Sequence, residues 1–244
     1  MRRPPSALLI RCLLPALVCA ATLSACGVVG PESGVGVNVS GVIVFPPTAG
    51  TAVFTASVDG QTQPIASARV AADGSYRLSL PALPTLPSRS NLEALPTVPS
   101  VLPDEIQGVA CSGEPVSSTP NARVLVLNSG TFSSDSAGGA VSGQLIPASA
   151  AVSNRLTSQD ILITTRTYAY ADRDVRLTGT LNCTFTRTDS STVGGTVQVN
   201  YDLKHGWNTL ETRTGQPSLN APIATVTGSQ TLANVNWRYL PITP

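Results

Sequence analysis

The sequence predicts an all-β protein whose body is an antiparallel β-sandwich type. Apolar and polar residues alternate over many short segments, which is the period of a half-buried strand. Turn dipeptides such as Asp59-Gly60 and Asp73-Gly74 separate these segments. Charged residues make up only 12% of the chain, Thr, Ser and Val are abundant, and the chain holds 20 Gly and 20 Pro. That composition is typical of extracellular β-sandwiches, in which Val and Thr build strands and Gly, Pro and Ser build loops.

The N-terminus predicts a secretory signal peptide over residues 1–25. Arg2 and Arg3 precede a mostly apolar run, Ala7 to Leu23, that is too short and too interrupted to span a membrane. Leu23-Ser24-Ala25-Cys26 follows directly and resembles the lipobox of bacterial lipoproteins. The resemblance implies that Cys26 is acylated and becomes the new N-terminus, with residues 26–34 as a short tether. The alternative is a plain secreted protein in which Cys26 has no special role.

A lipidated Cys26 predicts a protein of the cell envelope that is anchored to a membrane, at the outer membrane or the cell surface. Two or more acyl chains give stable anchoring, since each buried CH₂ contributes about 0.8 kcal/mol. Without residues 1–25 the chain keeps 12 basic and 14 acidic side chains, and its basic residues do not cluster. Nucleic acid is therefore not an expected partner.

The region 35–146 begins with four predicted strands, over residues 35–45, 51–58, 65–70 and 75–80. In the first of them Val35, Val37, Val39, Ile43 and Phe45 share the inward parity. Three stretches in this region resemble the carboxypeptidase-regulatory-like, or transthyretin-like, β-sandwich. The resemblance implies an accessory or adhesive module without catalytic residues. These stretches are Gly41-Val42, Pro64-Ile65-Ala66-Ser67-Ala68-Arg69-Val70 and Asp73-Gly74-Ser75-Tyr76-Arg77-Leu78.

Residues 81–103 contain six prolines and predict an extended excursion, because repeated Pro removes hydrogen-bond donors and prevents regular sheet. Ser88 to Leu95 has room for one helical turn. We expect a surface loop lying along the sandwich. The alternative is a docking site for a groove that reads Pro-rich chain.

The remaining strands are predicted over 123–127, 141–146, 161–171, from Val175 to Phe185, 197–203 and 235–239. Residues 149–158 have room for one short helix. The region 147–244 is expected to be an antiparallel meander with one face exposed to solvent. It is expected to form either a separate β region or one unit with residues 35–146. It is similar to the C-terminal part of uncharacterised bacterial envelope lipoproteins in three places. These are Tyr170-Ala171-Asp172-Arg173-Asp174, Tyr201-Asp202-Leu203 and Gly206-Trp207-Asn208.

Cys111 and Cys183 are the two cysteines that remain beside Cys26 in the mature chain. The secreted compartment permits a disulfide, and Cys183 has the inward parity of its strand. We therefore predict a bridge that pins the end of the Pro-rich excursion to the C-terminal sheet; two free cysteines are the alternative.

Few residues point to catalysis. His205, the only histidine, lies in a predicted turn, and no Gly-x-Ser-x-Gly motif accompanies it. Asp172 and Asp174 flank Arg173 and are expected to form a solvated, locally paired turn. We expect no catalytic residue, metal site or cofactor. A weak ligand-binding hypothesis places Tyr168, Tyr170 and Arg166 on one strand face as a sugar-stacking strip, whereas core packing is the usual role of such tyrosines.

These observations favour a non-catalytic binding, structural or accessory module of the envelope. Its expected partners are the membrane, through Cys26, and an envelope protein or a cell-wall glycan. The alternatives are a carbohydrate-binding module and a glycan-active or esterase-like enzyme. A carbohydrate-binding module requires exposed aromatic rings, so the positions of Trp207, Trp237, Tyr168 and Tyr170 decide whether this alternative has a basis.

Overall fold

The computed structural model describes residues 36–46, 48–97, 106–134, 141–151, 163–214 and 224–242. The predicted signal peptide, Cys26 and the tether 26–34 lie outside these residues. Nearly all regular structure is β-strand, which confirms the all-β prediction. Within the described ranges no helix has the length and apolar character needed to cross a membrane.

Seven of the described strands form a closed ring. The hydrogen-bonded order runs β2-β3-β4-β1-β15-β8-β7 and returns from β7 to β2, so each strand has a neighbour on both sides. All of these pairings are antiparallel except the one between β1 and β15. The ring strands are β1 (Val37–Val44), β2 (Gly50–Val58), β3 (Gln61–Val70), β4 (Ser75–Leu80), β7 (Val124–Ser134), β8 (Ser142–Pro147) and β15 (Trp237–Pro241).

The local sequence explains the ring's hairpins. Asp59 and Gly60 both have positive φ, 50° and 80°, as a two-residue type I′ hairpin requires, and they join β2 to β3. Alternation in β4 buries Tyr76, Leu78 and Leu80 and exposes the residues between them. The predicted inward residues of the last strand are also buried: Val235, Trp237 and Tyr239.

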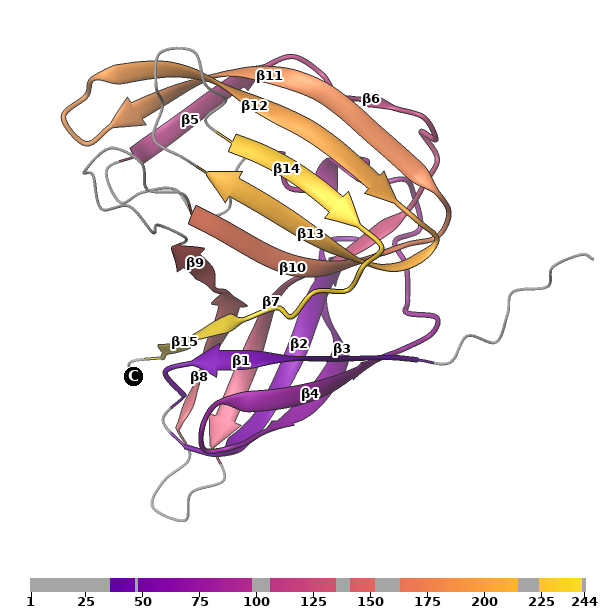
Figure 1. Cartoon of the computed structure of the whole chain (residues 1–244), viewed down its shortest axis with the longest axis vertical. Coiled ribbons are helices and arrows are strands. Elements are labelled where there is room, and N and C mark those ends of the chain that lie inside the picture. Colours follow the sequence, from indigo (N-terminus) through magenta and orange to yellow (C-terminus); the bar gives the residue numbers. More distant parts are fainter. Residues whose placement is uncertain are drawn as a thin grey trace, which may run out of the picture. The chain divides into compact units, whose positions relative to one another are not determined.

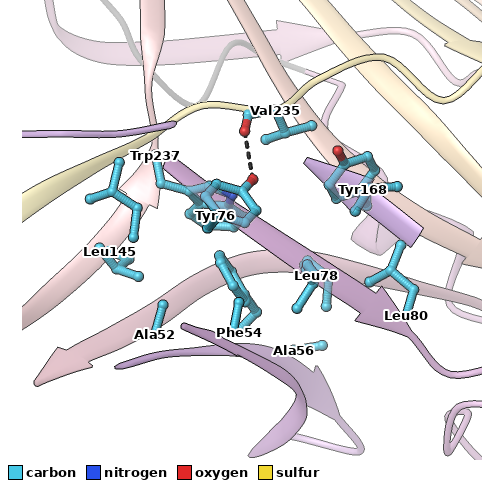
Figure 2. Close-up of a cluster of buried hydrophobic side chains, with 14 of the residues drawn as sticks. Ala52, Phe54, Ala56, Tyr76, Leu78, Leu80, Leu145, Tyr168, Val235 and Trp237 are labelled. Atoms are coloured by element: carbon cyan, nitrogen blue, oxygen red, sulfur yellow. Dashed lines mark hydrogen bonds between the residues drawn. The ribbon is translucent and has the colours of Figure 1, made fainter. Parts of the chain in front are cut away.

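Aromatic side chains fill the interior of the ring (Figure 2). The Phe54 ring packs between the rings of Tyr76 and Trp237, at centroid distances of 5.4 and 5.1 Å. The Tyr76 hydroxyl donates to the Val235 carbonyl at 2.6 Å, so the polar end of this buried ring is satisfied. Tyr168 lies at the border of the same cluster (Figure 2).

Phe45 departs from its predicted inward position. It follows the end of β1, has a positive φ of 62° and is 74% exposed. The left-handed backbone turns the chain out of the strand just before Pro46, so the alternation that held up to Ile43 no longer applies.

The other strands form an open sheet, which appears in the upper part of Figure 1 in the order β10-β13-β14-β12-β11-β5. Strand β7 joins the two parts: Val124, Leu125 and Val126 pair with β10, whereas the residues from Leu127 onward pair with β2. The short strands β6 and β9 pair with β11 and β10. The bounds are β5 (Ile106–Ser112), β6 (Val116–Ser117), β9 (Ser149–Ala151), β10 (Ile163–Ala171), β11 (Val175–Arg187), β12 (Thr192–Leu203), β13 (Gly206–Thr214) and β14 (Ala224–Ser229).

The open sheet is not the predicted meander. Strands β10 and β11 follow each other in sequence but are not paired, and β14 lies between β12 and β13, parallel to β12. At the corner between β10 and β11, Asp172 donates its backbone N–H to the Arg123 carbonyl. This hydrogen bond joins the end of β10 to the start of β7. Beyond the corner, β11 pairs with β5, β6 and β12 and not with β10. The wet face was predicted correctly, since β11 and β12 alternate between buried and exposed residues.

Residues 81–97, called here the cover segment, run from the ring, where Leu86 packs against the aromatic cluster and Ser88 bonds Asp59, to the open sheet, where Leu92 and Leu95 pack. The predicted helical turn is present as η1 (Leu92–Ala94), and Leu95 is fully buried in the sheet's hydrophobic cluster. The side-chain amide of Asn91 both donates to and accepts from the Val124 backbone, and the Tyr201 hydroxyl donates to the Pro96 carbonyl. Residues 81–97 are thus irregular and mostly exposed or half-buried, as expected of a loop lying along the sandwich, although Pro87 and Leu95 are buried. Residues 98–103 lie outside the description.

Strand pairing crosses the predicted regional boundary at residue 147 in several places. Strand β15 pairs with β1 and β8, β10 pairs with β7, and β11 pairs with β5. Residues 34–244 form one compact unit. Residues 149–151, expected to begin a short helix, form β9 instead, because they pair with the start of β10.

Candidate functional site

An open cleft of about 560 Å³ lies where the cover segment meets the open sheet. Leu177 and Leu181 of β11 contribute its apolar floor. Leu92 and Glu93 of η1 line one side, and Glu114 and Pro115, between β5 and β6, line the other. The cleft therefore lies between a regular strand and two irregular segments.

Two glycines shape the loop side of this cleft. Strands β5 and β6 pair with β11 at Ser112 and Val116, and the residues between them leave the ladder. Gly113 has φ +107°, and a Cβ there would lie 2.9 Å from the Thr180 carbonyl oxygen. A Cβ on Gly179 would lie 2.9 Å from the Pro115 Cα. Only residues without a side chain permit this approach of the loop to the strand.

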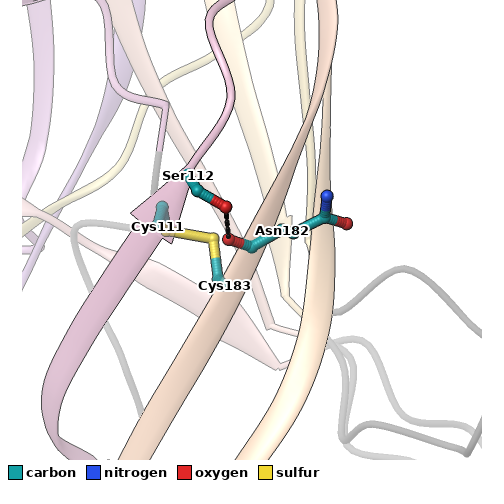
Figure 3. Close-up of a disulfide and its surroundings, with 4 residues drawn as sticks. All are labelled: Cys111, Ser112, Asn182 and Cys183. Atoms are coloured by element: carbon teal, nitrogen blue, oxygen red, sulfur yellow. Dashed lines mark hydrogen bonds between the residues drawn. A yellow bond between two sulfur atoms is a disulfide. The ribbon is translucent and has the colours of Figure 1, made fainter.

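Cys111 also lines the cleft, and its disulfide with Cys183 confirms the predicted bridge (Figure 3). The two cysteines are directly opposite each other in the β5–β11 ladder, with 4.0 Å between their Cα atoms. Cys183 is buried and Cys111 is exposed. Beside them Ser112 Oγ donates to the Asn182 carbonyl at 3.4 Å. The bridge thus fastens the edge strand that follows the cover segment.

The charge around the cleft has one sign. Glu93 of η1 and Glu114 of the loop after β5 are exposed carboxylates that both line it. No Lys or Arg lines the cleft within the part of the chain that the structure describes. The site therefore combines an apolar floor with a negative rim.

The predicted sugar-stacking strip is absent. Tyr168 and Tyr170 are both buried, and so are Trp207 and Trp237, so these rings have the usual role of core packing and the weak alternative of a sugar-stacking strip loses its basis. The Tyr168 hydroxyl donates to the Ala233 carbonyl at 3.0 Å, and burial raises the pKa of Tyr168 to about 12. This part of β10 packs against the aromatic cluster of the ring, which covers the strand face that the sequence suggested was wet.

Arg166, the third residue of that hypothesis, lies on the wet face of the open sheet. Its Nε donates to Glu211 Oε2 at 2.6 Å, and Arg213 Nε donates to the other carboxylate oxygen at 2.6 Å. Burial alone raises the pKa of Glu211, but the bonds from Arg166 and Arg213 outweigh it and hold the pKa below its usual value. This cluster is a surface ion-pair network and lies apart from the tyrosine rings.

The Asp172-Arg173-Asp174 turn is paired as predicted but only half solvated. The Asp172 side chain is 7% exposed, and its carboxylate accepts from the Arg123 backbone, Arg123 Nε and Arg173. Burial raises the pKa of Asp172, but these bonds outweigh burial and lower it overall. Asp174 is exposed and accepts from the His205 backbone at 2.8 Å.

His205 occupies the predicted turn before Gly206, whose φ is +100°. Its ring packs edge-on against Tyr170 at 6.1 Å between centroids. Among the described residues, no group of three or more His, Cys, Asp and Glu side chains could hold a metal ion.

A second, polar cleft of about 540 Å³ lies over β1, β4 and residues 232–234. It is lined by Asn38, Ser40, Arg77 and Asn234, and Ser40 Oγ donates to Asn234 Oδ1 at 3.2 Å. Sequence reasoning missed both clefts, because each is built from segments far apart in the chain. The one available signal for the apolar cleft was Gly179, which interrupts the alternation of β11.

No protein-family model, curated protein or solved structure matches this chain.

Proposed function

We propose that this protein is a bacterial envelope lipoprotein, anchored to a membrane through Cys26, whose body acts as a non-catalytic binding or accessory module. The observation that carries the proposal is Leu23-Ser24-Ala25-Cys26, placed directly after the charged and apolar segments of a signal peptide. Acyl chains on Cys26 would hold the body at a membrane surface.

The body supports this location and role. A structural disulfide is typical of proteins that mature in an oxidising compartment, and Cys111 and Cys183 form one. Its described acidic side chains largely serve structural pairs and turns: Asp172 bonds Arg123, Glu211 bonds Arg166, and Asp189 caps its own hairpin turn. The clefts offer surfaces for binding.

Fractionation of cells that express the full chain tests the anchor. The wild-type protein should be in the membrane fraction, require detergent for extraction and incorporate labelled palmitate. The Cys26→Ser variant should leave the membrane fraction and carry no label. Cys19→Ser, a matched change within the signal peptide, should behave as wild type. A Cys26→Ser protein that stays membrane-bound and labelled would overturn the anchor.

A second candidate function is the binding of a cell-wall glycan, and the polar cleft favours it. Arg77, Asn38 and Asn234 present guanidinium and amide groups of the kind that hydrogen-bond sugar hydroxyls. Co-sedimentation with insoluble cell-wall polysaccharide should then lose several-fold affinity in an Arg77→Ala, Asn234→Ala variant and none in Arg238→Ala, which alters an exposed arginine on β15. Equal sedimentation of all three proteins would rule the polar cleft out.

A further inference from the structure

The apolar floor of the cleft beside β11 is part of the open sheet's own core. Leu177 and Leu181 belong to its hydrophobic cluster, and each is 5% exposed. Leu95 packs into the same cluster, and the exposed edges of Leu177 and Leu181 line the cleft together with the half-buried Leu92 and Pro115. Apolar surface at the bottom of a concave site is covered favourably by an apolar ligand.

The size of the cleft fits a small molecule. About 560 Å³ lies within the roughly 300–1,000 Å³ of typical small-molecule sites. A protein partner would instead need about 800 Å² of surface on each side, which a cleft of this kind does not supply.

The rim selects the charge of the ligand. Glu93 and Glu114 approach from two different segments, and the described lining contributes no compensating cation. A cleft lined by one sign of charge with apolar walls concentrates ligands of the opposite sign. An anionic ligand would be repelled by both carboxylates.

We propose that this cleft binds a small molecule with an apolar body and a cationic head group. The apolar part lies on Leu177 and Leu181, and the head group lies between Glu93 and Glu114. This inference deepens the proposed binding role and rests on it, but it is independent of the lipid anchor.

Calorimetric titration tests the proposal on the full chain carrying Cys26→Ser, because an acyl chain on Cys26 would itself compete for an apolar cleft. The Cys111–Cys183 bridge is verified by mass beforehand. The probes are decyltrimethylammonium, the neutral decyl maltoside and the anionic decyl sulfate, each below its micelle concentration. The cationic probe should bind most tightly and the anionic probe most weakly.

Two variants separate charge from apolar contact. Glu93→Gln with Glu114→Gln should weaken the cationic probe by about fivefold, the size expected of two solvent-exposed charge pairs, and leave the neutral probe unchanged. Asp189→Asn with Asp202→Asn removes the same charge from two exposed sites elsewhere and should change nothing. Leu92→Asn should weaken all probes alike.

The proposal is overturned if no probe binds, if the three probes bind equally, or if the glutamine variant keeps its full affinity for the cation. Both glutamates are exposed, so their replacement leaves the fold intact and a folding failure cannot imitate the expected result. Loss of this proposal would leave the anchor of the proposed function untouched, since fractionation tests that separately.

Discussion

The ring and the open sheet pair their strand edges and cover their apolar faces in different ways. In the ring every strand has two neighbours, and aromatic side chains such as Phe54, Tyr76 and Trp237 fill the interior. The open sheet ends at β5, whose only strand partner in the described chain is β11. Leu92 and Leu95 of the irregular cover segment pack against its inner cluster, and its edge is fastened by the Cys111–Cys183 bridge.

This difference bears on which part of the protein leaves room for a ligand. Closure removes free strand edges and lets the ring pack its core on all sides. The open sheet is covered in part by an irregular segment, and a cleft lined by Leu92, Leu177 and Leu181 lies between that segment and β11. We infer that the open sheet carries the site for the apolar ligand proposed above, whereas the polar cleft lies over the ring strands β1 and β4.

The largest effect should come from the ring's core. Trp237→Ala removes a fully buried side chain that contacts Phe54, and it should lower the free energy of unfolding by about 3–5 kcal/mol. Urea denaturation measures this. Arg238→Ala, an exposed neighbour on the same strand, should change it by about 0.5 kcal/mol or less. If both variants lost equally little, the ring would not be the stable scaffold.

Removing the disulfide should have the next largest effect and act on the open sheet. Cys111→Ser with Cys183→Ser opens a loop of sequence separation 72 and should cost about 2–4 kcal/mol. Hydrogen exchange should rise more in β5 than in β2, because β5 has a partner on one side only. Reductant should destabilise the wild type and have no further effect on the variant. A uniform rise in exchange across both parts would contradict the comparison.

The smallest effect should come from Asp172, at the junction of the two parts. Its pKa is lowered in the folded state, so its contribution to stability is present above the ordinary pKa of about 3.9 and is lost as the pH falls through the folded value. Asp172→Asn should cost roughly 1 kcal/mol at neutral pH and reduce the acid-side slope of stability against pH. Urea denaturation between pH 7 and 3 measures this, and an unchanged slope would show that the Arg123 pair is not coupled to folding.

Particular residues show how far sequence reasoning reaches. The alternation in Ser75–Leu80 and in Val175–Phe185 correctly predicted which side chains are buried, and Asp59-Gly60 predicted a hairpin. Because Tyr168 and Tyr170 share the parity of Arg166, the sequence allows all three side chains to lie on one solvent-exposed face. The ring covers the two tyrosines and leaves the arginine free for Glu211, and nothing within β10 itself reports that contact.

The all-β class, most strand positions, the turn dipeptides and the Cys111–Cys183 bridge could be predicted from the amino-acid sequence, because each depends on local period or on a simple count of cysteines. That β14 lies between β12 and β13, that β7 joins both parts, and that Leu92 and Leu95 pack onto the open sheet could not be predicted in this way. The order of the strands in the sheet, and the segment that packs on the open sheet, depend on contacts between residues far apart in the sequence. A period-two pattern specifies which face of a strand is buried but not which surface buries it.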